Sequence, residues 1–187
     1  MLSSSATSHY SVVCPDGVEL SQAVELLHDH AFFIGCFPNV AKYEFMGTNK
    51  VPDSRVQEKH GVKAIAAAKQ YQVTDQVPGI PKWIWNADLV STYELIDIEK
   101  GVLVRIRGPL NTVVETVWEA RETAEGGVTL ASDLVIQCPR LVLGIVRGLC
   151  EEAPKRIHTK LVGKLREETM AKGWMKDEGV MSSSIHA

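Results

Sequence analysis

The side chains that could do chemistry in this sequence are scattered acids, bases and aromatic residues, not parts of a standard catalytic motif. The sequence contains no GxSxG elbow, no HExxH helix, no P-loop and no GxGxxG loop. His28 and His30 flank an aspartate, but residues two apart on a helix point to different sides, which disfavours a metal site. We therefore expect no metal and no other cofactor. Any catalysis would be acid–base work on a bound organic molecule.

The cysteines are predicted to be packing residues. They are scattered without a CxxC pair, so neither a disulfide framework nor a zinc site is expected. Cys150 has no basic neighbour in the sequence that would lower its pKa and make it a nucleophile. The four are Cys14, Cys36, Cys138 and Cys150.

Composition excludes several classes of function. The chain has 187 residues, of which 45% are apolar and 23% charged, with a net charge of −3. These values are typical of a folded protein that does not bind nucleic acid. No apolar run reaches the roughly 20 residues of a membrane span, and the N-terminus lacks the features of a signal peptide, so we expect a cytoplasmic protein. A single domain is expected over 9–175, with flexible termini at 1–8 and 176–187.

The elements that position the candidate groups follow a definite order along the chain. Alternating apolar residues predict a first strand, two short helices follow it, and a multi-stranded antiparallel meander comes next. A long helix begins after Pro139 and runs to about Lys172, and Pro154 should kink or interrupt it. The strands are expected at 9–14, 40–48, 66–77, 87–98, 102–107, 112–123 and 128–138, the short helices at 19–30 and through Phe33, and a loop at 50–61. The apolar stripe of the long helix is Val142, Val146, Leu149, Ala153, Ile157, Leu161 and Leu165.

An amphipathic helix laid across a curved sheet would bury the face that the sheet cannot bury alone. Within this α+β order, the distinctive residues are Tyr71-Gln72-Val73-Thr74-Asp75, Trp118, Leu134-Val135-Ile136-Gln137-Cys138-Pro139, Leu141, Cys150 and His158. With the order of elements, they give a sequence that resembles the helix-grip fold of the START-like and polyketide-cyclase (SRPBCC) superfamily, which includes the birch-pollen-allergen proteins, and in detail a fungal START-like family. The resemblance covers roughly residues 9–172 and implies an apolar cavity between helix and sheet.

Three turns predict which residues share a face of the sheet. Two-residue turns at Glu99-Lys100, Pro109-Leu110 and Glu125-Gly126 would pair neighbouring strands, and paired residues share a face. One face would then carry Glu94, Arg105, Thr116, Trp118, Asp133 and Gln137 together with Leu103, Val114 and Val135. The other face would be mostly apolar, with Glu115 and Glu119 among its residues.

Two interpretations of these faces compete. In the first, the face with the charged residues lies outside, and Glu94 and Arg105 form a surface ion pair of little energetic consequence. In the second, that face lines the cavity, and the other face is covered by the 50–61 segment or by another subunit. The predicted catalytic residues are then Arg105, Asp133 and Glu94, with Trp118, Thr116 and Gln137 contacting the substrate. A one-residue slip in any turn would move a strand's residues to the opposite face.

Other candidate substrate-binding residues lie outside this hairpin region. Trp83 and Trp85 follow a proline and could close over a flat ligand, although loop packing is the simpler interpretation. Tyr71 and Asp75 share a strand face. His158 lies on the flank of the long helix and is either a structural histidine or a proton shuttle.

Two functions follow from these expectations. The first is a cyclase that closes a ring, for example by lactonisation to a pyranone, in a hydrophobic poly-keto substrate delivered by a polyketide synthase of secondary metabolism. Arg105 would stabilise the oxyanion, and Asp133 or Glu94 would move the proton. The alternative is a non-catalytic carrier for a lipid, sterol or other hydrophobic metabolite. The apolar content of both sheet faces also agrees with a homodimer.

Overall fold

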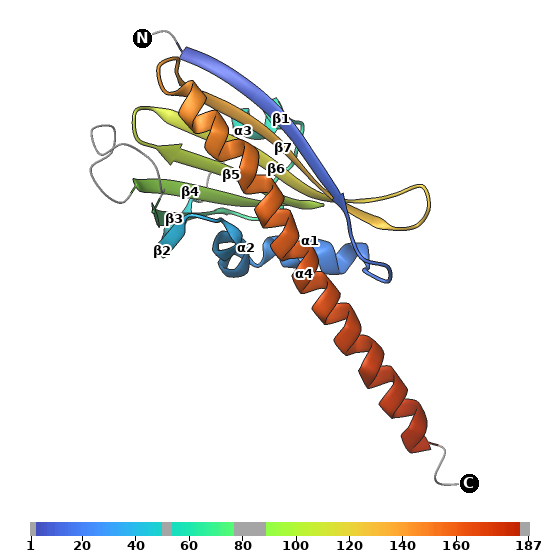
Figure 1. Cartoon of the computed structure of the whole chain (residues 1–187). Helices are drawn as coiled ribbons and strands as arrows, with labels where there is room; N and C mark the ends of the chain where they lie inside the picture. Colours follow the sequence, from blue (N-terminus) through green and yellow to red (C-terminus); the bar gives the residue numbers. More distant parts are fainter. Residues whose placement is uncertain (1–2, 50–53, 77–88, 184–187) are drawn as a thin grey trace.

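A single antiparallel sheet forms the centre of the computed structural model, which describes residues 3–49, 54–76 and 89–183 (Figure 1). Within these residues the sheet has seven strands in the order β1-β7-β6-β5-β4-β3-β2. The strands are β1 (Ser3–Val13), β2 (Val40–Asn49), β3 (Ala68–Asp75), β4 (Leu89–Ile98), β5 (Gly101–Gly108), β6 (Thr112–Glu122) and β7 (Val128–Pro139). The helices are α1 (Leu20–His28), α2 (His30–Cys36), α3 (Ser54–His60) and α4 (Leu143–Ser183). The predicted α+β helix-grip fold is confirmed.

The long helix α4 lies across one face of the sheet in its first half and extends beyond it in its second half (Figure 1). Ile157, Leu161 and Leu165 are at most 1% exposed and belong to the main core, as the predicted stripe requires. The helix continues through Pro154 without interruption. We call the sheet face that packs against α4 the inner face and the opposite one the outer face.

Local sequence determines where the two short helices divide. A single helix was expected over 19–30, but Asp29 ends α1 and begins α2, because its side chain accepts a hydrogen bond from the Phe32 amide at 3.0 Å. Leu26, Leu27 and Phe33 of this pair pack into the same core as α4. The two helices thereby close one end of the space between α4 and the sheet.

Helix α3 corrects the loop expected at 50–61. It covers the outer face, where its Lys59 and His60 side chains bond Glu115 of β6. Beside it, Val62 and Ala64 pack against a small outer-face cluster of Ala68, Ile96, Ile98, Leu103 and Val117. The outer face is therefore partly buried by the chain itself.

Two of the three predicted turns are one residue longer than expected. Glu99-Lys100 is a two-residue turn as predicted, and Glu94 pairs with Arg105. The next turn spans Pro109–Asn111 and pairs Arg105 with Glu115 instead of Val114. The last turn spans Ala124–Gly126, so that Trp118 pairs with Ser132 instead of Asp133. Each extra residue shifts the pairing register by one.

The two shifts change the composition of the faces. The first shift moves β6, and with it Thr116 and Trp118, to the face opposite Glu94 and Arg105. The second shift cancels the first for β7, so Asp133 stays on the face of Glu94 and Arg105. The predicted polar face is thus split between the two sides of the sheet.

Both termini continue regular structure further than predicted. Ser3–Ser8, expected to be flexible, belong to β1 and pair with β7 up to Pro139. Helix α4 continues to Ser183, beyond the boundary expected near Lys172.

Candidate functional site

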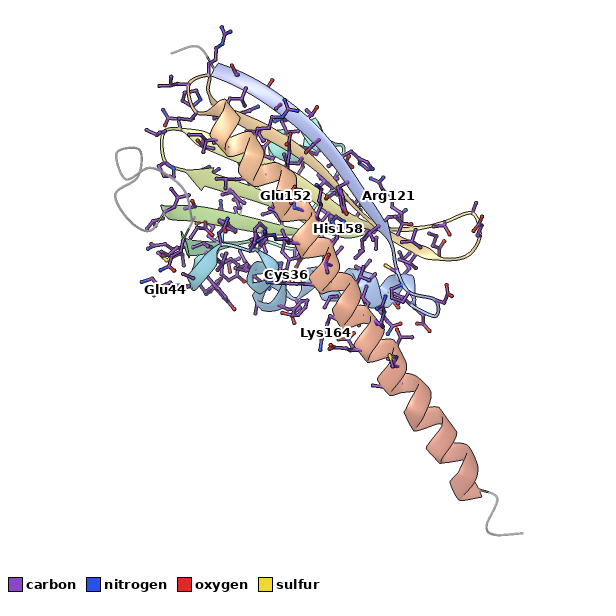
Figure 2. All side chains as sticks on the ribbon, in the orientation of Figure 1. Cys36, Glu44, Arg121, Glu152, His158 and Lys164 are labelled. Atoms are coloured by element: carbon purple, nitrogen blue, oxygen red, sulfur yellow. The ribbon has the colours of Figure 1, made fainter. Side chains whose placement is uncertain are left out.

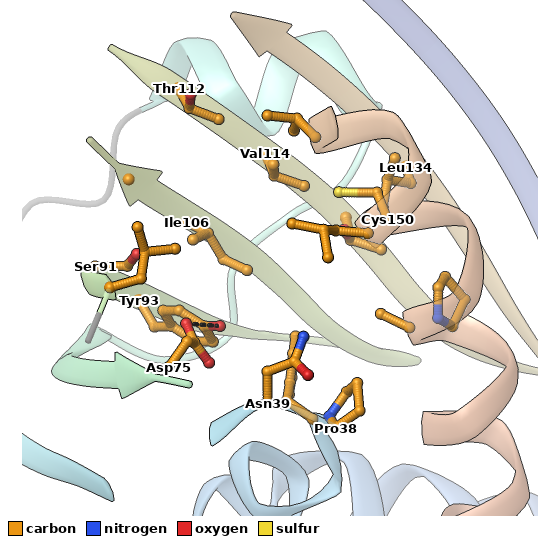
Figure 3. Close-up of a pocket in the computed structure, with 18 of the residues that line it drawn as sticks. Pro38, Asn39, Asp75, Ser91, Tyr93, Ile106, Thr112, Val114, Leu134 and Cys150 are labelled. Atoms are coloured by element: carbon orange, nitrogen blue, oxygen red, sulfur yellow. Dashed lines mark hydrogen bonds between the residues drawn. The ribbon is translucent and has the colours of Figure 1, made fainter. Parts of the chain in front are cut away.

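A cavity lies between the inner face and α4, as expected from the fold (Figure 3). Its volume is about 150 Å³, close to that of an engineered protein cavity that holds one benzene molecule. Strands β3 to β7 form one wall and α4 the other, and the segment after α2 closes a third side. The apolar walls include Phe37, Pro38, Ile106, Val114, Leu134, Ile145, Val146, Leu149 and Ile157.

Asp75 is the one ionisable carboxyl group among the described residues that line the cavity. It ends β3, is 7% exposed, and accepts a hydrogen bond from the Tyr93 hydroxyl at 3.4 Å (Figure 3). Burial raises the pKa of Asp75 to about 6, and the Tyr93 hydrogen bond opposes this only in part. The group therefore changes protonation near neutral pH, as a general acid–base catalyst requires.

The remaining polar groups of the cavity are neutral. Asn39, Ser91, Thr112 and Thr116 contribute amide or hydroxyl groups, and the described lining has no lysine, arginine or histidine. The absence of a cation in this lining explains why burial dominates the pKa of Asp75. The site can move a proton and donate neutral hydrogen bonds.

The three predicted catalytic residues lie outside this cavity, and their predicted place in it is corrected. Glu94 pairs with Arg107 at 3.4 Å on the outer face, although it is only 2% exposed. Arg105 is on the same face, 3.3 Å from Glu115. The physical reason is the longer Pro109–Asn111 turn, which places these groups opposite Trp118.

Asp133 is also an outer-face residue, with a side chain 47% exposed. Its carboxylate contacts His9 at 2.6 Å and Arg121 at 3.3 Å. These are surface ion pairs, of the kind that contribute little to stability. Gln137 is exposed and shares this face, which corrects its predicted contact with substrate.

The remaining predicted residues divide between cavity and core. Thr116 and Trp118 line the cavity together with Asp75. Tyr71 lies in the core beside the cavity, where its hydroxyl donates to His30 at 3.3 Å. His158 is 1% exposed and packs against Trp118. Trp83 and Trp85 lie outside the described residues.

A buried hydrogen-bond relay from Tyr71 through His30 to Asp97 connects α2 to the sheet. His30 Nε2 donates to Asp97 Oδ1 at 2.7 Å, and its Nδ1 accepts from Tyr71. Burial acts to raise the pKa of Asp97, but the hydrogen bond and charge of His30, together with the charges of His28 and Lys69, outweigh it and lower the pKa. None of the three lines the cavity, so we interpret the relay as structural.

Two residues of this site were not predicted from the sequence: Tyr93 as the partner of Asp75, and Asn39 as a cavity residue. Tyr93 lies near Asp75 because β3 pairs with β4 in antiparallel register, with Tyr71 opposite Tyr93. The connection between these strands is too long for a turn type to predict that register. Asn39 directly precedes Val40, the first residue of β2, and it belongs to no sequence motif.

Aromatic side chains form a continuous series along the inner face. Ring centroids are 5.3 Å apart between Tyr93 and Phe37, 5.6 Å between Phe37 and Phe33, 5.4 Å between Phe33 and Trp118, and 4.8 Å between Trp118 and His158. The series connects the Asp75–Tyr93 pair with the middle of α4, where His158 lies (Figure 2). Aromatic walls favour a flat or conjugated ligand.

Burial makes the cysteine thiols poor nucleophiles. It raises the pKa of Cys14 and Cys36 to about 11 and that of Cys150, which lines the cavity, to about 12. Cys14, Cys36 and Cys138 are at most 5% exposed and belong to apolar clusters. Their packing agrees with the role expected from the sequence.

Comparison with solved structures identifies the class of fold. The chain is 10% identical to the di-domain ARO/CYC protein StfQ of the steffimycin biosynthetic pathway, with a TM-score of 0.62 over 88% of this chain and 51% of StfQ. It thus spans about half the length of that two-domain protein. A START superfamily protein from Mycobacterium smegmatis is 11% identical, with a TM-score of 0.55 over 87% of this chain and 97% of its own. A Thalictrum flavum norcoclaurine synthase, solved with a transition state analogue, is 15% identical, with a TM-score of 0.54 over 90% and 98%.

The molecule therefore has a START-like, helix-grip fold. Its sequence places it more narrowly: residues 3–167 match the model of a domain of unknown function (DUF7053), and the chain belongs to that family. No curated protein is a significant match to the chain.

Among the described residues, no group of three or more histidine, cysteine or acidic side chains is arranged to hold a metal ion. No helix in the described ranges is both long enough and apolar enough to cross a membrane.

Proposed function

We propose that this protein is a cofactor-independent cyclase that closes one ring in a small poly-keto molecule by acid–base catalysis, for example by lactonisation to a pyranone. The observation that carries the proposal is Asp75, a buried carboxyl group in an apolar cavity whose pKa is raised to about 6. Asp75 takes the role that the sequence analysis gave to Asp133 or Glu94. In this proposal a polyketide synthase of secondary metabolism delivers the substrate.

The reaction needs one group that accepts a proton and later returns it. Ionised Asp75 removes the proton from an enol hydroxyl of the bound chain, and the enol oxygen attacks the thioester carbonyl. The new C–O bond closes the ring, the C–S bond breaks, and the thiolate takes the proton from Asp75. Asn39 and Thr116 are the neutral donors of the cavity wall that could stabilise the oxyanion in place of Arg105.

Cavity size supports a compact product. A volume of about 150 Å³ suits one six-membered ring with short substituents better than an extended polycyclic molecule. Confinement in such a cavity also brings the two ends of a flexible chain together, which lowers the entropy lost at ring closure. The ARO/CYC neighbours from biosynthetic pathways agree with this reaction class as an analogy of fold.

The second candidate is a carrier that binds a lipid, sterol or other hydrophobic metabolite without changing it. It is favoured by the nearly uniform apolar walls and by the absence of a cation from the described lining. A carrier needs no group with a pKa near neutrality, and for this reason we place it second.

A synthetic triketide thioester of N-acetylcysteamine tests the proposal. Wild-type protein should accelerate formation of the pyranone, followed by absorbance and mass spectrometry, above the rate in buffer. Asp75→Asn should reduce this acceleration by about 100-fold or more, whereas Asp133→Asn, the matched control on the outer face, should keep it. Binding of the thioester without acceleration would support the carrier, and full activity in a folded Asp75→Asn protein would contradict the role of Asp75.

A further inference from the structure

Among the buried polar atoms that lack a hydrogen-bond partner in the described part of the chain, three belong to neighbouring residues beside the cavity. They are Trp118 Nε1, Ser132 Oγ and His158 Nε2. The three residues are 2%, 1% and 1% exposed, so bulk water does not reach them. An unsatisfied buried polar group is costly, because it has lost its hydrogen bonds to water and gained none in the protein. Three of them in neighbouring residues indicate a place for a polar group of a bound molecule.

The three residues form one layer between the sheet and α4. Trp118 of β6 is the register partner of Ser132 in β7, and Ser132 is in turn the partner of Tyr10 in β1. The imidazole of His158 lies over this row, with its ring centroid 4.8 Å from those of Trp118 and Tyr10. Trp118 also lines the cavity, as does Ile157 next to His158. The layer therefore adjoins the cavity, at the opposite end of the aromatic series from Asp75.

Donors and acceptors in the layer select one kind of group. His158 Nδ1 lies 2.8 Å from the Pro154 carbonyl, which can only accept, so Nδ1 carries the hydrogen and Nε2 of the neutral ring is an acceptor. Burial lowers the pKa of His158, which favours the neutral ring. The backbone of Pro154 and of Leu130 opposes this shift, although Nε2 makes no hydrogen bond with Leu130.

Trp118 and Ser132 supply the other two hydrogen-bonding groups of the layer. The indole Nε1 of Trp118 only donates, and the Ser132 hydroxyl can donate or accept. A partner that satisfies both Trp118 and His158 must accept one hydrogen bond and donate another. A hydroxyl group does both, whereas a carbonyl, ether or carboxylate oxygen cannot donate.

We propose that Trp118, Ser132 and His158 bind one hydroxyl group of the molecule that occupies the cavity. This inference rests on the proposed function, because it requires the cavity to be a ligand site. It defines the ligand class as a small ring or conjugated molecule with a hydroxyl, phenol or enol group at the end remote from Asp75. The hydroxyl site orients the ligand so that its other end meets the Asp75 carboxyl group.

Phenol and toluene are a matched pair of probes, because they differ only in a hydroxyl or a methyl group on one ring. Their affinities are measured by isothermal titration calorimetry on wild type, Ser132→Ala, His158→Phe and Asp75→Asn, with Ser11→Ala on exposed β1 as the matched serine control. Each variant is first checked for folding by circular dichroism. Ser132→Ala removes a single oxygen and is the primary variant, so the test stands even if His158→Phe does not fold.

An apolar cavity without this site would favour toluene, because the phenol hydroxyl would lose its hydrogen bonds to water. We expect wild type to bind phenol at least as tightly as toluene. Ser132→Ala and His158→Phe should each shift the affinity ratio about tenfold toward toluene, and Ser11→Ala should leave it unchanged. A shift in Asp75→Asn alone would place the hydroxyl at Asp75 and overturn the inference.

The remaining outcomes separate this inference from the proposed function. If both probes bind and the ratio is the same in wild type and Ser132→Ala, the layer holds no ligand hydroxyl and the inference fails while the cavity remains a ligand site. If neither probe binds, the cavity is not a site for small rings, and both proposals fail.

Discussion

The two faces of the sheet bury carboxyl groups in opposite ways. On the inner face, Asp75 is 7% exposed, its partner is the Tyr93 hydroxyl, and burial raises its pKa to about 6. On the outer face, Glu115 is 4% exposed and lies 2.6 Å from Lys59 and 3.1 Å from His60. Burial acts to raise its pKa too, but the hydrogen bonds from these two residues and the charges of Lys59 and Arg105 together outweigh it and lower the pKa.

Neighbouring cations, and not burial alone, decide how each carboxyl group behaves. A buried carboxylate with cationic partners stays ionised and holds structure together, as Glu115 attaches α3 to the sheet. A buried carboxyl group without such partners exchanges its proton near neutral pH. For this reason we place chemistry on the inner face and structural ion pairs on the outer face.

The largest loss of stability is expected when an unpaired carboxylate is introduced on the inner side of the sheet. Ile157→Asp puts a charge where α4 meets the core, at a residue that is 1% exposed. The variant should lose roughly 3–5 kcal/mol of unfolding free energy in urea denaturation, whereas Thr159→Asp on the exposed side of α4 should lose little. Wild-type stability in Ile157→Asp would show that this stripe does not face the core.

Removal of the Glu115 carboxylate from the outer face should cause the next largest loss of stability. Glu115→Ala leaves Lys59, His60 and Arg105 without their shared partner and should lower the unfolding free energy by about 3 kcal/mol. Because the folded-state pKa is lowered, the contribution of Glu115 is present above its ordinary pKa of 4.5 and is lost as pH falls through the lowered value. The difference between wild type and Glu115→Gln should therefore shrink in acid, while cyclising activity is kept. A difference that grows in acid would contradict the sign of this shift.

Replacing Asp75 with a neutral residue should have the opposite effect from replacing Glu115: it should raise the unfolding free energy instead of lowering it. Its pKa is raised from 3.8 to about 6, so the folded state loses stability as pH rises through this range, and the cost reaches about 3 kcal/mol above pH 6. Asp75→Asn removes this cost and should be up to that amount more stable than wild type at pH 8 but similar at pH 4. Thermal unfolding at the two pH values measures the effect. A variant that is less stable than wild type at pH 8 would mean that ionised Asp75 has a favourable partner.

The smallest effect is expected at Asp133. Its side chain is 47% exposed, so Asp133→Asn should change the unfolding free energy by less than about 0.5 kcal/mol. The rate of pyranone formation should also be unchanged. A loss of cyclising activity in this folded variant would mean that the outer-face residue Asp133 takes part in the reaction.

The sequence was sufficient to predict the order of the strands and the buried stripe of α4, because period-two strands and a 3.6-residue helix leave repeating patterns. It was not sufficient to predict the registers. Leu110 and Asn111 both have φ of 55°, and no residue of that turn distinguishes a three-residue loop from a two-residue turn. One extra residue there moved Thr116 and Trp118 to the face opposite Arg105.

The candidate site was harder to predict than the fold, because it depends on neighbours that are distant in sequence. Asp75 and Asp133 are equivalent as residue types. Asp75 ends β3 beside Tyr93 in the cavity, whereas Asp133 lies between His9 and Arg121 at the surface. The strand registers and the packing of α4 against one face of the sheet separate the two environments.

Carboxyl-carbon NMR titration of Asp75 and Glu115 in one sample tests the difference between the two faces most directly, with Asp75→Asn and Glu115→Gln used to assign the signals. We predict that Asp75 titrates near pH 6 and Glu115 below its ordinary value of 4.5. Titration of Asp75 near 3.8, or of Glu115 above 4.5, would contradict the account.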